Sequence, residues 1–201
     1  MNEPDGRRAK LSNTRGRVAP TQLAHIVRRT SRFDAMVQWH QTVLAAHVVH
    51  SDGMLAFLTY DQEHHRIAIA HIPGLEDQPQ MAAGTDHVAF THADLGDLLY
   101  TYARLKAEGI EPYWCINHGP TTSMYYKDPD GNRVELQVDN YPSAEETNRW
   151  MRSGAFAANP IGVVFDPDDL LARYQAGEPI ETLTKRPSLP AGTTPFEMLR
   201  F

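Results

Sequence analysis

The chain has 201 residues, of which 41% are hydrophobic and 22% are charged, and its formal net charge is -6. This size and apolar content fit a single globular domain with a substantial core, and the negative charge argues against a nucleic-acid-binding surface. The sequence has no apolar run long enough to span a membrane, no apolar signal segment at its start, and one cysteine, Cys115. A disulfide framework within the chain is therefore excluded, and we expect a cytoplasmic protein that binds neither nucleic acid nor membrane.

The first half of the chain shows a strand, a helix and three further strands after a polar start. Residues 1–20 are basic, rich in polar residues and without periodicity, so we expect a flexible leader. Apolar residues then alternate or recur at helical spacing, and Asp52-Gly53 is typical of a hairpin turn. The expected elements are a strand at 23–28, a helix at 33–46, and strands at 47–51, 54–60 and 66–72.

The second half repeats this order after a polar connection at 75–84. The sequence Asp-Pro-Asp-Gly-Asn at 128–132 has the composition of a turn between the last two strands. We predict an α+β domain over 21–143, built from two β-α-β-β-β modules at about 21–74 and 85–141, which form one curved mixed sheet with the helices outside. The elements expected in the second module are a strand at 86–91, a helix from 95 to about 109, and strands at 112–117, 123–127 and 133–138.

The remaining residues, 144–201, have a different pattern. Helical stretches are expected near 144–153 and 168–175, whereas residues 177–201 contain four prolines and few periodic apolar positions. We expect residues 177–201 to lie over the domain surface or to reach a partner subunit. Several of its apolar side chains need cover, which predicts a homo-oligomer. These residues are Leu170, Leu171, Phe196, Met198, Leu199 and Phe201.

The segment 118–135 contains the strongest functional signal. It ends in Glu135, which stands among apolar residues in the strand at 133–138, and a buried carboxylate needs a cation or a hydrogen-bond donor. Strand alternation turns Glu135 toward the concave side of the sheet. His25 and His87 occupy equivalent positions on the opening strands of the two modules and would join it there. Two histidines and one carboxylate leave coordination positions open and suit non-haem Fe(II).

The same segment resembles the signature of type I extradiol dioxygenases, the catechol-cleaving enzymes of the vicinal oxygen chelate superfamily. The turn followed by a glutamate is common to the wider superfamily, and the histidine and tyrosine add specificity. The likeness covers residues 22–141, so the chain has one such domain where larger members carry two. The matching positions are His118, Met124-Tyr125, Asp128-Pro129, Gly131 and Glu135.

The resemblance implies a reaction and a role for each site residue. Fe(II), with Mn(II) as the alternative ion, would be held by the two histidines and the glutamate named above. A small aromatic diol would react with O2 to give a ring-opened semialdehyde or dienoate. His71, sixteen residues before His87, would be the catalytic acid and base. His118 would hydrogen-bond the substrate or the oxygen, and Tyr125 would contact a catechol oxygen.

Two other functions stay open from the sequence. One is a different enzyme of the superfamily, such as a glyoxalase-type isomerase or an epoxide-opening thiol transferase. Glyoxalase-like sites use a fourth ligand on the strand that corresponds to 66–72, where only His71 would serve. The other is a metal-free drug-binding protein of the same fold, which has no need for the two histidines and the glutamate. The sequence does not define the ring system of the diol, the oligomer size or the role of 177–201.

Overall fold

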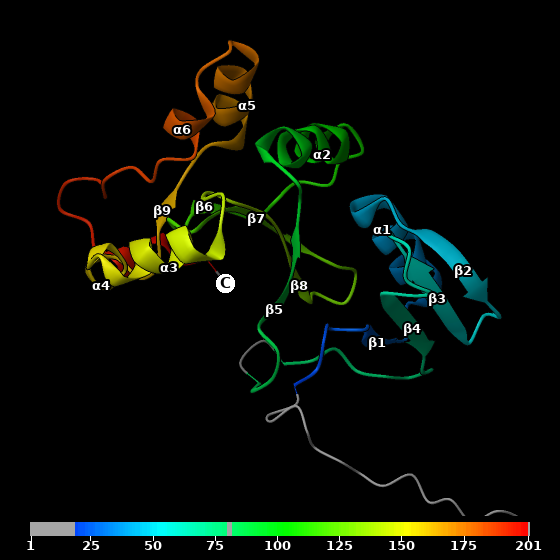
Figure 1. Cartoon of the computed structure of the whole chain (residues 1–201). Helices are drawn as coiled ribbons and strands as arrows, with labels where there is room; N and C mark the ends of the chain where they lie inside the picture. Colours follow the sequence, from blue (N-terminus) through cyan, green and yellow to red (C-terminus); the bar gives the residue numbers. More distant parts are fainter. Residues whose placement is uncertain (1–18, 80–81, 201) are drawn as a thin grey trace, which may run out of the picture.

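The first module forms a four-stranded sheet with a helix on one face (Figure 1). The computed structural model describes residues 19–79 and 82–200, so the predicted leader at 1–20 lies almost wholly outside the described residues. The strand order is β1-β4-β3-β2, with β1 parallel to β4 and the other pairs antiparallel. The elements are β1 (Ile26–Thr30), α1 (Phe33–Leu44), β2 (His47–Ser51), β3 (Leu55–Thr59) and β4 (Ile67–His71).

The local sequence explains these elements. The hairpin between β2 and β3 forms where it was predicted, because the Asp52 carboxylate accepts hydrogen bonds from the N–H groups of Met54 and Leu55. Gly53 has a φ of +84°, a conformation that glycine adopts without steric cost. One face of α1 packs on one face of the sheet to form the first core. Its buried members include Phe33, Met36, Ala56, Leu58, Ile67 and Ile69.

The second module repeats the arrangement with a five-stranded sheet in the order β5-β8-β7-β6-β9. Asp94 caps the helix α2 by accepting a hydrogen bond from the N–H of Asp97. The predicted turn at 128–132 is confirmed, since the Asp128 carboxylate accepts hydrogen bonds from the N–H groups of Asp130 and Asn132. The elements are β5 (His87–Thr91), α2 (Leu95–Ala107), β6 (Trp114–Asn117), β7 (Thr121–Lys127), β8 (Arg133–Asp139) and, from the extension, β9 (Val163–Val164).

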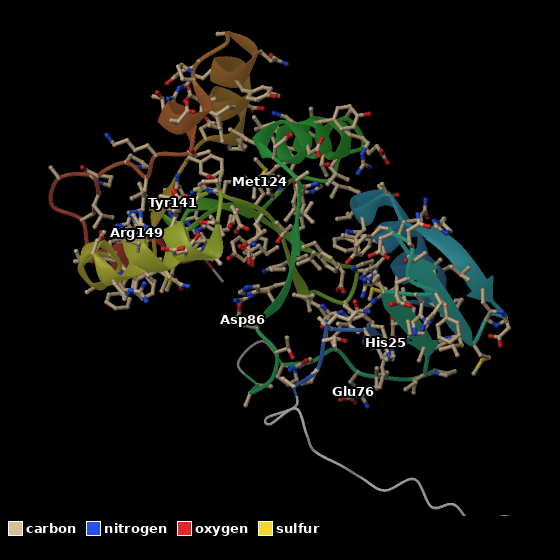
Figure 2. The ribbon with its side chains drawn as sticks, in the orientation of Figure 1. His25, Glu76, Asp86, Met124, Tyr141 and Arg149 are labelled. Carbon is tan, nitrogen blue, oxygen red and sulfur yellow. The ribbon has the colours of Figure 1, made fainter. Side chains whose placement is uncertain are left out.

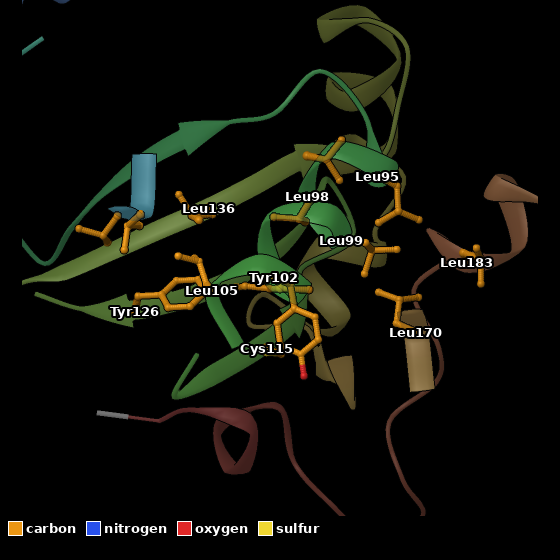
Figure 3. Close-up of a cluster of buried hydrophobic side chains, with 14 residues drawn as sticks. Leu95, Leu98, Leu99, Tyr102, Leu105, Cys115, Tyr126, Leu136, Leu170 and Leu183 are labelled. Atoms are coloured by element: carbon orange, nitrogen blue, oxygen red, sulfur yellow. The ribbon is translucent and has the colours of Figure 1, made fainter. Parts of the chain in front are cut away.

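The C-terminal extension packs on the second module. It continues the sheet through β9, and its residues Leu170 and Leu183 join the buried cluster around α2 (Figure 3). Met198 is buried with Ile116 and Tyr125 on the opposite face of the same sheet. The helices expected near 144–153 and 168–175 are confirmed. The elements are α3 (Ala144–Arg152), α4 (Ala155–Ala158), α5 (Pro167–Gln175), α6 (Ile180–Leu183) and the 3-10 helix η1 (Pro195–Met198).

The α+β class and the two β-α-β-β-β modules are confirmed, but the modules do not share one sheet within the chain. They meet instead through their helices, and α1 lies beside α2 (Figure 1). Val43 of α1 is buried in the core of the second module, with Trp39 and Leu44 packed against that core. Arg104 of α2 donates a hydrogen bond to the carbonyl oxygen of Thr42 at 2.7 Å. The sequence prediction missed this contact because Val43 and Leu44 continue the apolar spacing of Phe33 and Met36, and spacing alone does not show which of them pack outside their own module.

The reason given for an oligomer is wrong in part. Leu170 and Met198 are buried within the chain and Leu171 packs against the second core, whereas Phe196 is exposed. Phe201 lies outside the described residues. Among the helices that the structure describes, none is long and apolar enough to cross a membrane.

Candidate metal centre

Strands β5 and β8 bring His87 and Glu135 together. The strands run parallel, and Ala89 is the register partner of Glu135, so His87 lies two residues before that level on the neighbouring strand. The Nε2 atom of His87 lies 3.0 Å from Oε2 of Glu135. Glu135 is only 4% exposed, so its carboxylate is removed from water and depends on its neighbours.

The second ring nitrogen of His87 is also occupied. Nδ1 lies 2.7 Å from the Asp86 carboxylate, and Arg133 donates a hydrogen bond to the other oxygen of that carboxylate at 2.8 Å. The hydrogen bond with Glu135 raises the pKa of His87. Burial alone would raise the pKa of Glu135, but hydrogen bonds from His87 and Ser123 outweigh it and lower that pKa. Glu135 is therefore a carboxylate at neutral pH.

These two donors fit a metal ion. With the Nδ1 proton held by Asp86, the Nε2 lone pair faces a carboxylate oxygen, and a proton or a cation is needed between the two atoms. Two ligands held at right angles about 2.1 Å from one ion are about 3.0 Å apart, which matches the observed spacing. A carboxylate behind a histidine ligand is the usual way of orienting that ligand. Asp86 was not singled out from the sequence.

Tyr125 and His118 lie next to this pair. Tyr125 is the register partner of Glu135 on β7, and its ring stands edge-on to the His87 ring at 5.3 Å between centroids. His118 Nδ1 lies 2.5 Å from the carbonyl oxygen of Ile161. Because a carbonyl only accepts, Nδ1 carries the proton, and Nε2 accepts a hydrogen bond from the Tyr125 hydroxyl at 3.0 Å. The C-terminal extension thus fixes the tautomer of His118.

Burial sets the protonation states of this second pair. It lowers the pKa of His118, so the ring is neutral at pH 7. It also raises the pKa of Tyr125, with a further contribution from the Glu135 charge, so the phenol keeps its proton. Trp114 and Tyr113 line the same face, and the Trp114 ring lies 4.6 Å from the Tyr125 ring. A protonated donor, a neutral acceptor and flat aromatic walls suit an aromatic substrate with hydroxyl groups.

The structure places His25 elsewhere, on the first module. Figure 2 shows His25 there and Asp86, the neighbour of His87, on the second module. The His25 ring lies 4.4 Å from the ring of His65, which in turn lies 4.5 Å from the ring of Phe57. Within the described residues, no set of three His, Cys, Asp or Glu side chains that could hold a metal comes together. The predicted ligand set is therefore divided between the two sheets.

His71 stands on the wrong face and at the wrong end of β4 for the predicted role. Ile67 and Ile69 belong to the core beneath α1, so alternation turns His71 to the same helix-covered face, where its ring stacks on Phe33 at 5.7 Å. Register pairs His71 with Thr30, at the far end of β1 from His25. The structure favours His65, which the sequence analysis left without a role, as the histidine beside His25.

A cavity of about 630 Å³ lies between β1 and the segment that follows β4. Its wall contains neither His87 nor Glu135 and is largely charged, with Arg28, Arg29 and Asp77 among the lining residues. Burying an aromatic ring against such groups would leave them without water or partners. This cavity is therefore a poor match for a catechol.

Comparison with known proteins agrees with the fold. Residues 22–136 match the family described as the Glyoxalase/Bleomycin resistance protein/Dioxygenase superfamily. The chain belongs to this superfamily. A protein from Rhodococcus globerulus, "Biphenyl-2,3-diol 1,2-dioxygenase 2", is 48% identical over 167 residues, which cover 83% of this chain and 88% of the relative. "Biphenyl-2,3-diol 1,2-dioxygenase 3" of the same organism is 45% identical over 167 residues, which cover 82% of this chain and 88% of the relative. These relatives confirm the resemblance to catechol-cleaving dioxygenases.

A solved structure supports the fold alone. The crystal structure of a glyoxylase/bleomycin resistance protein/dioxygenase domain from Frankia sp. EAN1pec has a TM-score of 0.51 at 15% sequence identity. The match covers 60% of this chain and 99% of the Frankia chain. The matched length corresponds to the two modules without the extension.

Proposed function

We propose that this superfamily member opens the ring of a catechol-type aromatic diol with O2, by extradiol cleavage next to the two hydroxyl groups. The observation that carries the proposal is the His87–Glu135 pair, oriented by Asp86 and flanked by the Tyr125–His118 pair. The proposal also rests on the names of the two Rhodococcus globerulus relatives, which are dioxygenases of biphenyl-2,3-diol. The product is a ring-opened semialdehyde or dienoate.

The proposed cofactor is Fe(II), with Mn(II) as the alternative. His87 and Glu135 lie together as two of its proposed ligands, and His25, the third proposed ligand, lies on the first module. When bound, this ion supplies the redox chemistry that joins O2 to the diol, and it lowers the pKa of the diol hydroxyl groups. The ligand chemistry supports the choice, since two imidazoles and one carboxylate suit non-haem Fe(II). The deeply buried Glu135 offsets part of the charge of the ion.

The neighbouring side chains bind the diol and move its protons. When the diol binds, the Tyr125 hydroxyl would exchange its hydrogen bond to His118 Nε2 for one to a diol oxygen, because its raised pKa keeps the phenol protonated and it has one proton to donate. His118, neutral and with Nδ1 held by Ile161, then offers Nε2 as the acceptor for the proton that the diol releases. Trp114 stacks beside Tyr125 and would contact the flat face of the ring.

We assign the remaining acid and base role to His65 rather than His71. His65 lies beside His25, and burial lowers its pKa, which favours the neutral ring at pH 7. A histidine with a pKa near or below neutrality takes up and returns a proton during turnover. His71 faces α1 and would not reach a diol on the other face of the sheet.

A glyoxalase-type site has less support. It needs a fourth ligand from β4 on the face that carries His25, and alternation places Ala68 and Ala70 there. Neither residue can coordinate a metal.

The test is anaerobic reconstitution with Fe(II), followed by oxygen uptake with catechol, 3-methylcatechol, 2,3-dihydroxybiphenyl and protocatechuate. We expect stoichiometric iron, uptake of one O2 per diol and a yellow product with at least one of them. Iron-loaded protein that binds these diols and consumes no O2 would contradict the proposal, and tight binding of apolar drugs without iron would favour the sequestration function.

A further inference from the structure

A short loop of the C-terminal extension places a carbonyl oxygen on the ring of His118. The loop runs from Asn159 to Gly162, and its Ile161 carbonyl accepts the Nδ1–H of His118 at 2.5 Å. The buried Asn159 side chain braces this loop from within. Its Oδ1 atom accepts hydrogen bonds from the N–H groups of Ile161 and Gly162 at 3.1 and 2.8 Å, and its Nδ2 atom donates to the Gly162 carbonyl at 2.9 Å. The carbonyl that contacts His118 therefore belongs to a braced turn.

This turn lies very close to the end of β6. Gly162 has a φ of +124°, a conformation that favours glycine. A Cβ atom at this position would lie 2.5 Å from the carbonyl oxygen of Asn117 and 2.9 Å from the Cα atom of His118. Pairing of Asn117 with Val163 continues the contact into the sheet. Only a glycine permits this approach, which brings the Ile161 carbonyl to the histidine ring.

Arg186 ties the turn to the backbone of His118. Its Nη1 atom donates hydrogen bonds to the carbonyl oxygens of Asn159 at 2.8 Å and His118 at 3.2 Å, and its Nη2 atom donates to that of Ala155 at 3.0 Å. One cation thus holds both sides of the hydrogen bond between His118 and Ile161. It binds His118 directly, and it binds the turn through Asn159, two residues before Ile161.

The partners of Arg186 differ from those of a surface ion pair. They are backbone carbonyl oxygens and the Trp150 ring, over which the guanidinium lies at 4.9 Å. Trp150 packs on Gly119, directly after His118, where a Cβ atom would overlap the ring. By contrast, Arg173 of the same extension pairs with the Glu178 carboxylate at 2.6 Å. A planar guanidinium that stacks and donates in fixed directions defines the shape of the backbone around it.

We propose that Arg186 is a positioning residue for His118. It holds the Ile161 carbonyl on Nδ1, so the ring keeps its proton there and turns the Nε2 lone pair toward Tyr125 and the diol. Without a fixed carbonyl the proton also occupies Nε2, and the ring then donates where the reaction needs an acceptor. The effect on turnover rests on the proposed function, whereas the effect on the tautomer requires neither metal nor substrate.

The first test measures the tautomer directly. The full chain is labelled with nitrogen-15 histidine, and the ring nitrogens are observed by NMR at pH 7.5, both without metal and with diamagnetic Zn(II). The His118 signals are assigned by their loss in His118→Gln. We expect the proton on Nδ1 in the wild type and a mixture of both tautomers in Arg186→Ala. A wild-type ring with its proton on Nε2, or an Arg186→Ala variant with the wild-type tautomer, would overturn the proposal.

The second test separates turnover from binding. A proton acceptor is typically worth about a hundred- to ten-thousand-fold, and the Ile161 carbonyl is still present in Arg186→Ala, so we expect a smaller loss of about tenfold in kcat for oxygen uptake. KM for the diol should stay within about twofold of the wild type, because Tyr125 and Trp114 still contact the substrate. A lower melting temperature with unchanged kcat would show an ordinary structural staple and would contradict the assigned role.

The matched control is Arg173→Ala, which removes an arginine from the same extension and should keep both the tautomer and kcat. Equal losses in this variant would assign the effect to a loosened extension and overturn the proposal. Gly162→Ala displaces the same carbonyl while Arg186 stays in place, so it should also give a mixture of tautomers, and a wild-type tautomer there would count against the proposal. Protein that consumes no O2 with any diol would refute the proposed function, whereas the tautomers would still decide the role of Arg186.

Discussion

The role of Asp86 gives a quantitative prediction about metal affinity. Its carboxylate accepts the Nδ1–H of His87 at 2.7 Å and so directs Nε2 toward Glu135. Loss of such a partner typically weakens metal binding about 10- to 100-fold. The Asp86 side chain is 65% exposed, so water replaces part of the lost hydrogen bond. We therefore expect about tenfold weaker binding in Asp86→Ala, which corresponds to about 1.4 kcal/mol.

A graded series tests this reasoning. Asp86→Asn keeps an acceptor oxygen without the charge, so its loss should be smaller, about threefold. Asp139→Asn removes an exposed carboxylate from the far end of the same strand β8 as Glu135 and should bind metal like the wild type. Mn(II) affinity is measured by competition with a chelator at pH 7.5. An Asp86→Ala variant within twofold of the wild type would refute an orienting role for Asp86.

Three further predictions concern individual residues. His65→Gln should keep its iron but lose about a hundred- to ten-thousand-fold in turnover, whereas His71→Gln should be near normal, and the reverse result would restore the role first given to His71. Tyr125→Phe should raise KM for the diol with little change in metal content, because only a donor to the substrate is lost; equal diol binding in titrations would contradict this. Burial lowers the pKa of His40 from 6.5 to about 4. As the pH falls, His40 therefore binds a proton in the unfolded chain at a higher pH than in the folded chain. About 2 kcal/mol of folding stability should be lost between pH 7.5 and pH 5. Urea unfolding of the wild type and His40→Leu at both pH values checks this, and the variant should lack this part of the pH dependence.

The sequence alone determined the elements and one half of the site. Alternation and helical spacing located the strands and the two long helices, and the turn at 128–132 aligned β7 with β8. With that register, strand geometry alone turns Tyr125 and Glu135 to one face, and His118 follows at the end of β6. These relations are local, since each depends on neighbours within a few residues or across one hairpin.

Tertiary structure decided how the two modules relate. The sequence shows that α1 is amphipathic, but not that Val43, at the end of its apolar spacing, packs into the core around α2. That docking separates His25 from His87, and the register of β1 with β4 places His71 beneath the helix and leaves His65 beside His25. Such relations depend on packing between segments far apart in the chain, and no local pattern encodes which apolar residues of a helix pack on its own sheet and which pack on another helix.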